Sequence, residues 1–75
     1  METLRAYLND LTSTEQNDFV IRCGTTINYL RKAISIGQLL GEGLCIRIDK
    51  ESAGAVCCES LRPDVDWAYL RAKAA

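Results

Sequence analysis

The 75-residue chain contains no histidine, the side chain best suited to acid–base chemistry near neutral pH. It also has no glycine-rich phosphate loop and no nucleophile placed beside a base. Its acidic residues are scattered, and most lie where helices are expected to begin and favour the helix dipole. These absences argue against an enzyme, and they leave no candidate residues for a cofactor.

Long apolar runs are missing as well. No run approaches the roughly 18 residues of a membrane-spanning helix. The first ten residues, METLRAYLND, lack the basic and then apolar segments of a secretory signal. Apolar residues make up 48% and charged residues 25%, which is ordinary for a globular domain. We therefore expect a single domain over residues 1–75, in the cytoplasm and without a membrane partner.

Four cysteines are present, but no two have the C-x-x-C spacing typical of zinc sites. A metal site would require Cys23 and Cys45 to converge with the adjacent Cys57 and Cys58, which is poor ligand spacing. A disulfide framework is equally disfavoured without a secretion signal. We expect no metal site, and we interpret the four residues as small buried side chains in a reducing compartment.

In the first third of the chain, apolar residues recur at the spacing of an α-helix. Residues 2–11 are expected to form an amphipathic helix because their apolar side chains recur at i, i+3, i+4 and i+7. A capping box then predicts the start of a second helix over about 14–23. Either Thr12 or Ser13 provides this box, each followed by a Glu or Gln three residues later.

Glycines set the next boundaries. Gly24 is expected to end the second helix and Gly37 the third, because glycine adopts the left-handed conformation after a helix at little cost. Thr25 and Thr26 can cap the third helix, which is predicted over about 26–36.

The second half of the chain continues the all-α pattern. A fourth helix is expected to begin in GEG, residues 41–43, and to end near Gly54. After a single turn over CESL, Pro63 precedes a last helix over about 64–73, with Asp64 or Asp66 at its start. The predicted fold is therefore a compact bundle of about five short helices.

The second and third helices, over about 14–36, match the helix-turn-helix plan, in which the second helix of the pair enters the DNA major groove. No acidic residue occurs between Phe19 and Gly41, although the whole chain has a net charge of -1. The local field is therefore positive where DNA would approach. Polar and cationic residues recur at i, i+3, i+4 and i+7 on one face of the third helix: Asn28, Arg31, Lys32 and Ser35.

The side chains on this face suit the chemistry of base edges. Asn bonds adenine in bidentate fashion, Arg bonds guanine, and Ser bonds either. Lys32 can reach a base or a phosphate, and Ile27 at the border of the face can touch a thymine methyl group. The alternative is a face that is merely solvated. The helix-turn-helix context and the absence of acids favour DNA.

QNDFVIRCGTTINYLRKAISIG, residues 16–37, resembles the helix-turn-helix of phage Cro-type repressors. The shared features are Gln at the start of the second helix, Gly in the turn, and KAI near the end of the third helix. The sequence departs from the pattern at Val20, where Ala is usual, and at Thr25, where an aliphatic residue is usual. The YLRKAIS-x-G run, the GEG start of the fourth helix and the LRPDVDWAYLR ending extend the resemblance over about 4–71, to the YdaS-like subgroup of the Cro/CI family.

This resemblance implies a small, lambda-repressor-like regulator of a bacterium or phage, usually carried by a prophage, that binds double-stranded DNA in the nucleoid. Gln16 falls on the position that meets a phosphate, which suits a helix N-terminus. Arg22 is a second phosphate candidate, or else it is solvated. The base-reading positions fall on Thr26, Ile27, Asn28, Arg31, Lys32 and Ser35.

The end of the chain carries a large apolar cluster of Trp67, Tyr69 and Leu70. We expect these residues to fold back on the first and fourth helices and complete the core. The alternative is a dimer or partner surface, where Trp and Tyr are favoured. Recognition of a half-site by one small module is weak, so a homodimer on a palindromic operator is expected.

The leading hypothesis is a sequence-specific DNA-binding transcriptional repressor, and two further hypotheses compete with it. Some members of the resembled family are antitoxins, which would neutralise a toxin protein and regulate their own operon through the same fold. Many antitoxins carry a disordered tail, and the few residues after Trp67 leave little room for one. A binding module that had lost DNA recognition would have lost Arg31 and Lys32, and both are present.

Overall fold

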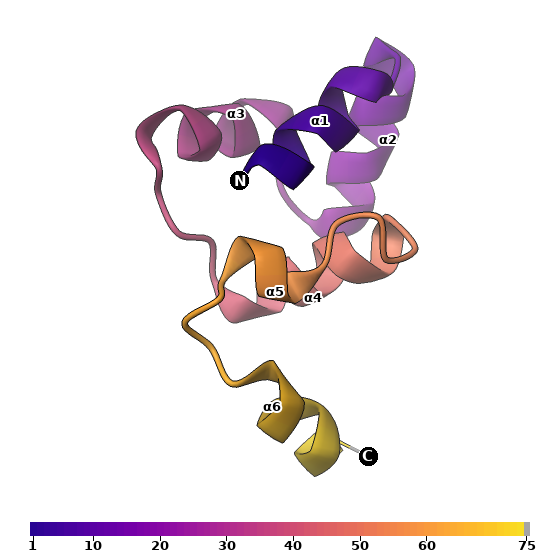
Figure 1. Cartoon of the computed structure of the whole chain (residues 1–75). Coiled ribbons are helices and arrows are strands. Elements are labelled where there is room, and N and C mark those ends of the chain that lie inside the picture. Colours follow the sequence, from indigo (N-terminus) through magenta and orange to yellow (C-terminus); the bar gives the residue numbers. More distant parts are fainter. Residues whose placement is uncertain (75) are drawn as a thin grey trace.

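The computed structural model of the chain describes residues 1–74 and contains six α-helices and no strand within that range (Figure 1). Ala75, the last residue of the expected domain, lies outside the described residues. The all-α prediction is confirmed, and α2 and α3 form the expected helix-turn-helix. The CESL turn closes as a separate short helix, so one helix more than expected is present. The helices are α1 (Glu2–Asp10), α2 (Ser13–Cys23), α3 (Ile27–Ile36), α4 (Glu42–Glu51), α5 (Cys58–Leu61) and α6 (Trp67–Ala74).

Polar side chains fix the starts of α2 and α6. The Thr12 hydroxyl oxygen accepts from the backbone N–H of Glu15 at 3.2 Å, and the Glu15 carboxylate accepts from the N–H of Thr12 at 2.8 Å. This is the predicted capping box, in its Thr12 form. Of the two aspartates predicted to begin the last helix, Asp66 is the one that caps it, accepting from the N–H of Tyr69 at 3.1 Å.

Within residues 1–74, none of the helices has the length and apolar character needed to span a bilayer.

One hydrophobic core is shared by the five helices from α1 through α5 and by the start of α6. Phe19 of α2 is fully buried, and its ring centroid lies 5.2 Å from that of half-buried Tyr7 on α1. Burying a side chain of this size stabilises the fold by about 1.5–3 kcal/mol. The buried core residues are Leu4, Leu8, Phe19, Val20, Cys23, Leu30, Ala33, Leu40, Cys45, Ile48, Val56, Cys58, Leu61 and Trp67.

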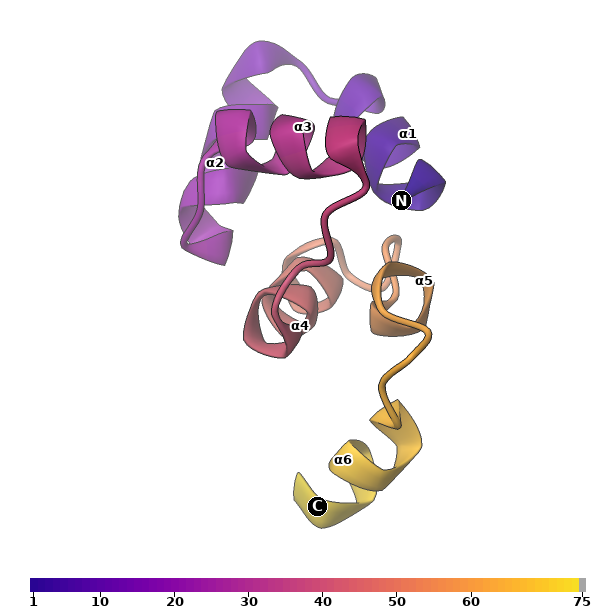
Figure 2. The ribbon, with the colours of Figure 1, turned by 90° about the vertical axis from the view of Figure 1, so that its left-hand side faces the viewer.

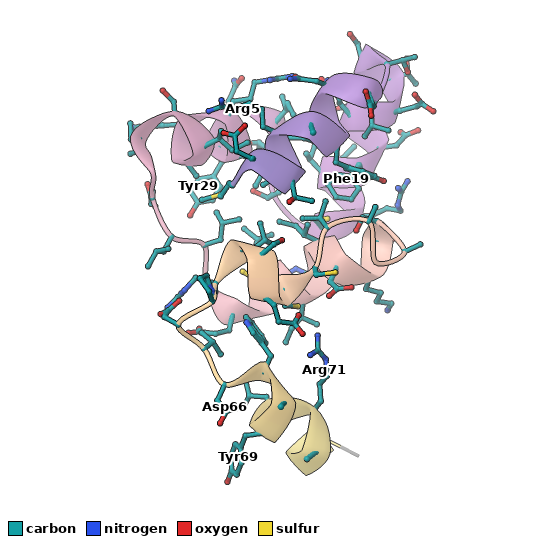
Figure 3. The ribbon with its side chains drawn as sticks, viewed as in Figure 1. Arg5, Phe19, Tyr29, Asp66, Tyr69 and Arg71 are labelled. Carbon is teal, nitrogen blue, oxygen red and sulfur yellow. The ribbon has the colours of Figure 1, made fainter. Side chains whose placement is uncertain are left out.

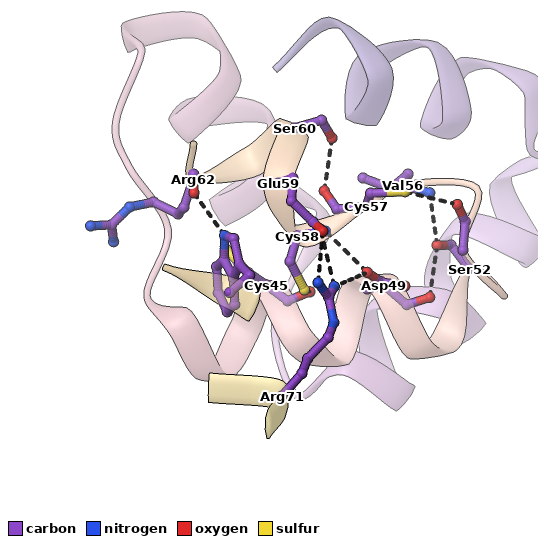
Figure 4. A network of polar contacts seen from close by, with 12 residues as sticks. Cys45, Asp49, Ser52, Val56, Cys57, Cys58, Glu59, Ser60, Arg62 and Arg71 are labelled. Carbon is purple, nitrogen blue, oxygen red and sulfur yellow. Dashed lines mark hydrogen bonds and ion pairs between the residues drawn. The ribbon is translucent and has the colours of Figure 1, made fainter. Parts of the chain in front are cut away.

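Polar side chains at the end of α4 hold the loop that leads to α5 (Figure 4). The buried N–H of Val56 donates to the hydroxyl of Ser52 at 3.0 Å, and this hydroxyl donates to the carbonyl of Asp49 at 3.2 Å. The N–H of Cys58, at the start of α5, donates to the Asp49 carboxylate at 3.0 Å. These bonds satisfy backbone groups that the loop leaves outside any helix, and they fix α5 against α4.

Arg62 joins the segment before α4 to the segment before α6. Its Nη1 donates to the carbonyl of Leu40 at 2.8 Å, and its Nε and Nη2 donate to the carboxylate of Asp64 at 3.0 and 2.8 Å. The carbonyl of Arg62 in turn accepts from the indole N–H of Trp67 at 2.8 Å. The indole is therefore buried with its one polar atom satisfied.

The expectation for the C-terminal cluster holds for Trp67 alone, which is 4% exposed. It is wrong for Tyr69 and Leu70, which are 60% and 39% exposed. It is also wrong about α1, because α6 lies at the opposite end of the molecule and meets α4 and α5 instead (Figures 1 and 2). Arg71, four residues after the buried Trp67, turns toward the body, whereas Tyr69 points away from it (Figure 3). So short a helix, attached along one face, leaves the side chains of residues 68–70 exposed to solvent.

Arg71 provides the second attachment of α6. Its Nη1 and Nη2 donate to the two carboxylate oxygens of Glu59 at 2.7 and 3.0 Å, and Nη2 lies 3.9 Å from the carboxylate of Asp49 (Figure 4). Such paired bonds are among the stronger ion pairs. The bonds from Arg71 lower the pKa of Glu59 to about 2.

The cysteines are free thiols, three of them buried. Burial raises the pKa of Cys23 and Cys45 and raises that of Cys58 to about 11, so these thiols stay protonated and unreactive. The expectation that all four are buried is wrong for Cys57, which is exposed. Cys57 is the N-cap residue of α5, where the chain turns into the helix at the surface.

Replacing Trp67 by alanine is expected to lower the free energy of unfolding by about 3–5 kcal/mol, because it removes a buried ring and leaves a cavity. Ile21→Ala is the control, since Ile21 is exposed on α2 and its loss should change stability by no more than about 0.5 kcal/mol. Chemical denaturation followed by circular dichroism measures both. A Trp67→Ala protein as stable as the control would show that α6 is not part of the core.

The Glu59–Arg71 pair should make stability depend on pH in the acid range. The folded-state pKa of Glu59 is about 2, below its ordinary value of 4.5, so the pair's contribution is complete above about pH 4.5 and is lost as the pH falls toward 2. We expect the difference in melting temperature between the wild type and Glu59→Gln to shrink over this interval. Glu2→Gln shows the general effect of removing a surface carboxylate. A Glu59 difference that stays constant from pH 7 to pH 2 would contradict the pairing.

Candidate nucleic-acid interface

A left-handed glycine joins α2 to α3. Gly24 has φ 74° and ψ 32°, a conformation that other residues adopt only with strain. Its N–H bonds the carbonyl of Ile21 at 3.0 Å, and the N–H of Thr25 bonds the carbonyl of Val20 at 2.9 Å. This pair of bonds closes the end of α2 and sends the chain directly into α3.

A side chain from α4 braces this turn. The Nε of Arg47 donates to the carbonyl of Cys23, the last residue of α2, at 2.6 Å. The carbonyls at a helix end have no partner within the helix, so this bond satisfies one of them with a cation, which also suits the helix dipole. Arg47 was not expected from the sequence, because the bond joins residues 24 positions apart and has no local pattern.

Capping and core packing fix the rotation of α3 about its axis. The hydroxyl oxygen of Thr26 accepts from the N–H of Tyr29 at 3.1 Å and caps the helix, as predicted. Leu30 and Ala33 are buried, and Ile27 and Ile34 are half-buried against the core. Ile27 therefore lies at the border of the exposed surface, where the sequence placed it.

The opposite side of α3 is open to solvent. Turned by 90°, the molecule presents α3 with no other helix in front of it (Figure 2). Four of the six predicted base-reading residues are exposed there and share this side at i, i+3, i+4 and i+7. We call these residues the α3 polar face: Asn28, Arg31, Lys32 and Ser35.

The cations of the α3 polar face are not used inside the molecule. Among the described residues, the side chains of Arg31 and Lys32 make no hydrogen bond and no ion pair. Both are therefore available to an external anion or to an acceptor atom on a base. Each of the other five arginines pairs with a carboxylate or donates to a carbonyl: Arg5, Arg22, Arg47, Arg62 and Arg71.

The two phosphate candidates on α2 already have internal partners. The amide nitrogen of half-buried Gln16 donates to the carbonyl of Leu8 at 2.7 Å and approaches that of Leu11 at 3.5 Å. The second contact is at the limit of a hydrogen bond, so one N–H can still turn to a phosphate. Arg22 donates through Nε to Glu51 at 3.1 Å, and its terminal nitrogens make no hydrogen bond in the described part of the chain.

Helix α1 flanks the α3 polar face with two residues that were not predicted from the sequence as DNA contacts. Arg5 and Asn9 of α1 line a polar hollow together with Arg31, Ile34 and Ser35 of α3. The packing of α1 beside α3 is a tertiary feature, and the only local signal is that Arg5 and Asn9 lie four residues apart on an exposed side of α1.

Binding, rather than bond-making, is what these side chains can perform. The α3 polar face offers an amide, a hydroxyl and two cations, all of which donate hydrogen bonds to nucleic acid. Among the described residues, no three cysteine, aspartate or glutamate side chains gather to hold a metal ion.

Thr26 is expected to contribute to stability as a helix cap. Thr26→Ala should lower the free energy of unfolding by about 1 kcal/mol, because an N–H of α3 loses its acceptor, whereas Thr26→Ser keeps the oxygen and most of the stability. Ser35→Ala, on the exposed side of the same helix, is the control and should be nearly neutral. The measurement is urea denaturation, and equal stability of all four proteins would remove the cap assignment.

The chain is locally similar to one curated protein of Escherichia coli (strain K12), described as "Putative transcriptional regulator YdaS". The two are 53% identical over 30 residues, a segment that covers 40% of this chain and 31% of YdaS. No family model matches the chain, and no solved structure matches it. The comparisons therefore support a regulator-like protein, without extending to the Cro/CI assignment that the sequence resemblance implied.

Proposed function

We propose that this chain is a sequence-specific DNA-binding transcriptional regulator that acts as a Cro-type repressor and inserts α3 into the major groove. The observation that carries the proposal is the α3 polar face, which is exposed, free of acidic residues and supplied with two cations that no described residue engages. The local similarity to a transcriptional regulator supports the same class.

The roles of the α3 polar face follow from its chemistry. Arg31 presents two parallel donors to the O6 and N7 atoms of guanine, and Asn28 matches the donor and acceptor pair of adenine. Ser35 and Lys32, further along the same side, contact a base or a phosphate. At its N-terminal edge, Thr26 and Ile27 complete the base-reading set, with the isoleucine directed at a thymine methyl group.

Backbone contacts from α2 position α3 in the groove. Gln16 lies in the first turn of α2, where the positive end of the helix dipole favours a phosphate. Arg22 reaches a phosphate with its terminal nitrogens while its Nε stays on Glu51. Such contacts give affinity and register but carry no sequence information.

A second copy of the chain completes the recognition of a palindromic site. One module reads a half-site, and two copies bind half-sites about one helical turn apart. A largely apolar hollow of about 340 Å³ between α4 and α6, bordered by the exposed Ile46 and Leu70, favours a second candidate function. In that function the chain is an antitoxin that holds a toxin protein in this hollow and regulates its own operon through α3.

The proposal is tested by selecting bound sequences from random duplex DNA and then measuring affinity for the selected site and for scrambled DNA. Arg31→Ala should cost about 1–3 kcal/mol on the selected site and relax the preference at one base position. Arg22→Ala should weaken binding to both DNAs by a similar factor and make the slope of log affinity against log salt smaller by about one. Lys50→Ala, which removes an exposed cation from α4, is the charge-matched control.

Three results would overturn this function. The selection returns no enriched sequence, or Arg31→Ala binds the selected site as tightly as the wild type, or Arg31→Ala and Lys50→Ala lose affinity equally. In each case the α3 polar face is only a solvated surface. A thermal melt of every variant verifies that lost binding does not reflect lost folding.

A further inference from the structure

The polar hollow between α1 and the second half of α3 has a volume of about 310 Å³. Two arginines line it, Arg5 from α1 and Arg31 from α3, together with Asn9 and Ser35. Ile34 is the one apolar residue of the lining, and no carboxylate belongs to it. Two cationic residues therefore share a hollow whose lining residues offer hydrogen-bond donors and include no carboxylate.

The internal partner of Arg5 is weak. Arg5 contacts Glu2, three residues earlier on the same helix, at 3.2 Å, and the two side chains are 48% and 82% exposed. Ion pairs of this kind contribute little because water and salt screen them and both side chains are mobile. Arg5 can therefore exchange Glu2 for a ligand at small cost. Arg31 has no partner to exchange within residues 1–74.

A planar guanidinium beside an amide and a hydroxyl is the donor set that binds a phosphate oxygen pair. A carboxylate ligand would suit the same donors, but the hollow adjoins the surface proposed to face DNA. Arg31 and Ser35 belong both to the hollow and to the α3 polar face. When α3 lies in the major groove, a phosphate that borders the groove passes beside α1.

We propose that this hollow binds a phosphate of the DNA backbone, held by Arg5 and Asn9 of α1 next to the base that Arg31 reads. This inference rests on the proposed function, since it adds a backbone contact to the same interface. It assigns to α1 a phosphate contact on one flank of α3. This contact is separate from those proposed for Gln16 and Arg22 of α2. Arg5 then acts on affinity and register, whereas Arg31 acts on sequence.

The test compares Arg5→Ala and Asn9→Asp with the wild type in binding to the selected site and to scrambled DNA, over a series of salt concentrations. Arg5→Ala should lose about three- to tenfold in affinity for both DNAs, with the selected sequence preference unchanged and the salt slope smaller by about one. Asn9→Asp places a carboxylate in the hollow at almost constant volume and should lose at least as much. Lys50→Ala is again the charge-matched control and should keep the wild-type affinity. Melting temperatures within a few degrees of the wild type show that the variants are folded.

The outcomes separate this inference from the function on which it rests. If Arg31→Ala loses specific binding while Arg5→Ala and Asn9→Asp bind like the wild type, the hollow is not a DNA contact and the proposed function stands. If the wild type selects no DNA sequence, the proposed function itself fails. A further arm titrates inorganic phosphate at constant ionic strength. A phosphate-dependent rise in melting temperature that Arg5→Ala abolishes, with DNA affinity unaffected, would assign the hollow to free phosphate and overturn the backbone contact.

Discussion

The hydrogen bond from Arg47 to the carbonyl of Cys23 holds the end of α2, from which α3 and its polar face depart, against α4. Gly24 lets the chain reverse without strain, but a left-handed residue by itself sets only the local direction. The guanidinium holds the end of α2 against α4, and α4 is tied through the core to the remaining helices. The side chains of α3 are therefore presented by a rigid support rather than by a loop, which is what recognition of a base edge requires.

Charge is distributed so that a slightly acidic chain shows a cationic surface. Most arginines neutralise carboxylates or hold carbonyls, as Arg62 does with Asp64 and Arg71 with Glu59. Arg31 and Lys32 are left uncompensated on α3, so the local field there has the opposite sign to the net charge of -1. Because the other arginines are paired with carboxylates or carbonyls, the unpaired arginine charge of the described residues lies on α3. The net charge of the whole chain therefore does not predict which ligand the protein attracts.

The features that the sequence predicted are those with local causes. The Thr12 box, the Gly24 and Gly37 ends and the exposed side of α3 follow from neighbouring residues and a helical period. The Arg47 brace and the pairing of α1 with α3 depend on residues distant in sequence, which no periodicity reveals. Tyr69 was misplaced for a related reason: apolar character predicts burial only where a neighbouring surface is available, and α6 meets the body on one side.

Cys57 is exposed and the other three thiols are buried, so the number of reactive thiols reports whether the protein is folded. A thiol-reactive reagent meets one accessible sulfur in the native molecule and four in the unfolded chain. Cys57 lies before α5 and not on α3, so a fluorophore attached there labels the molecule at one point without entering the α3 polar face. The natural sequence thus already contains a single-site reporter, with no engineered cysteine.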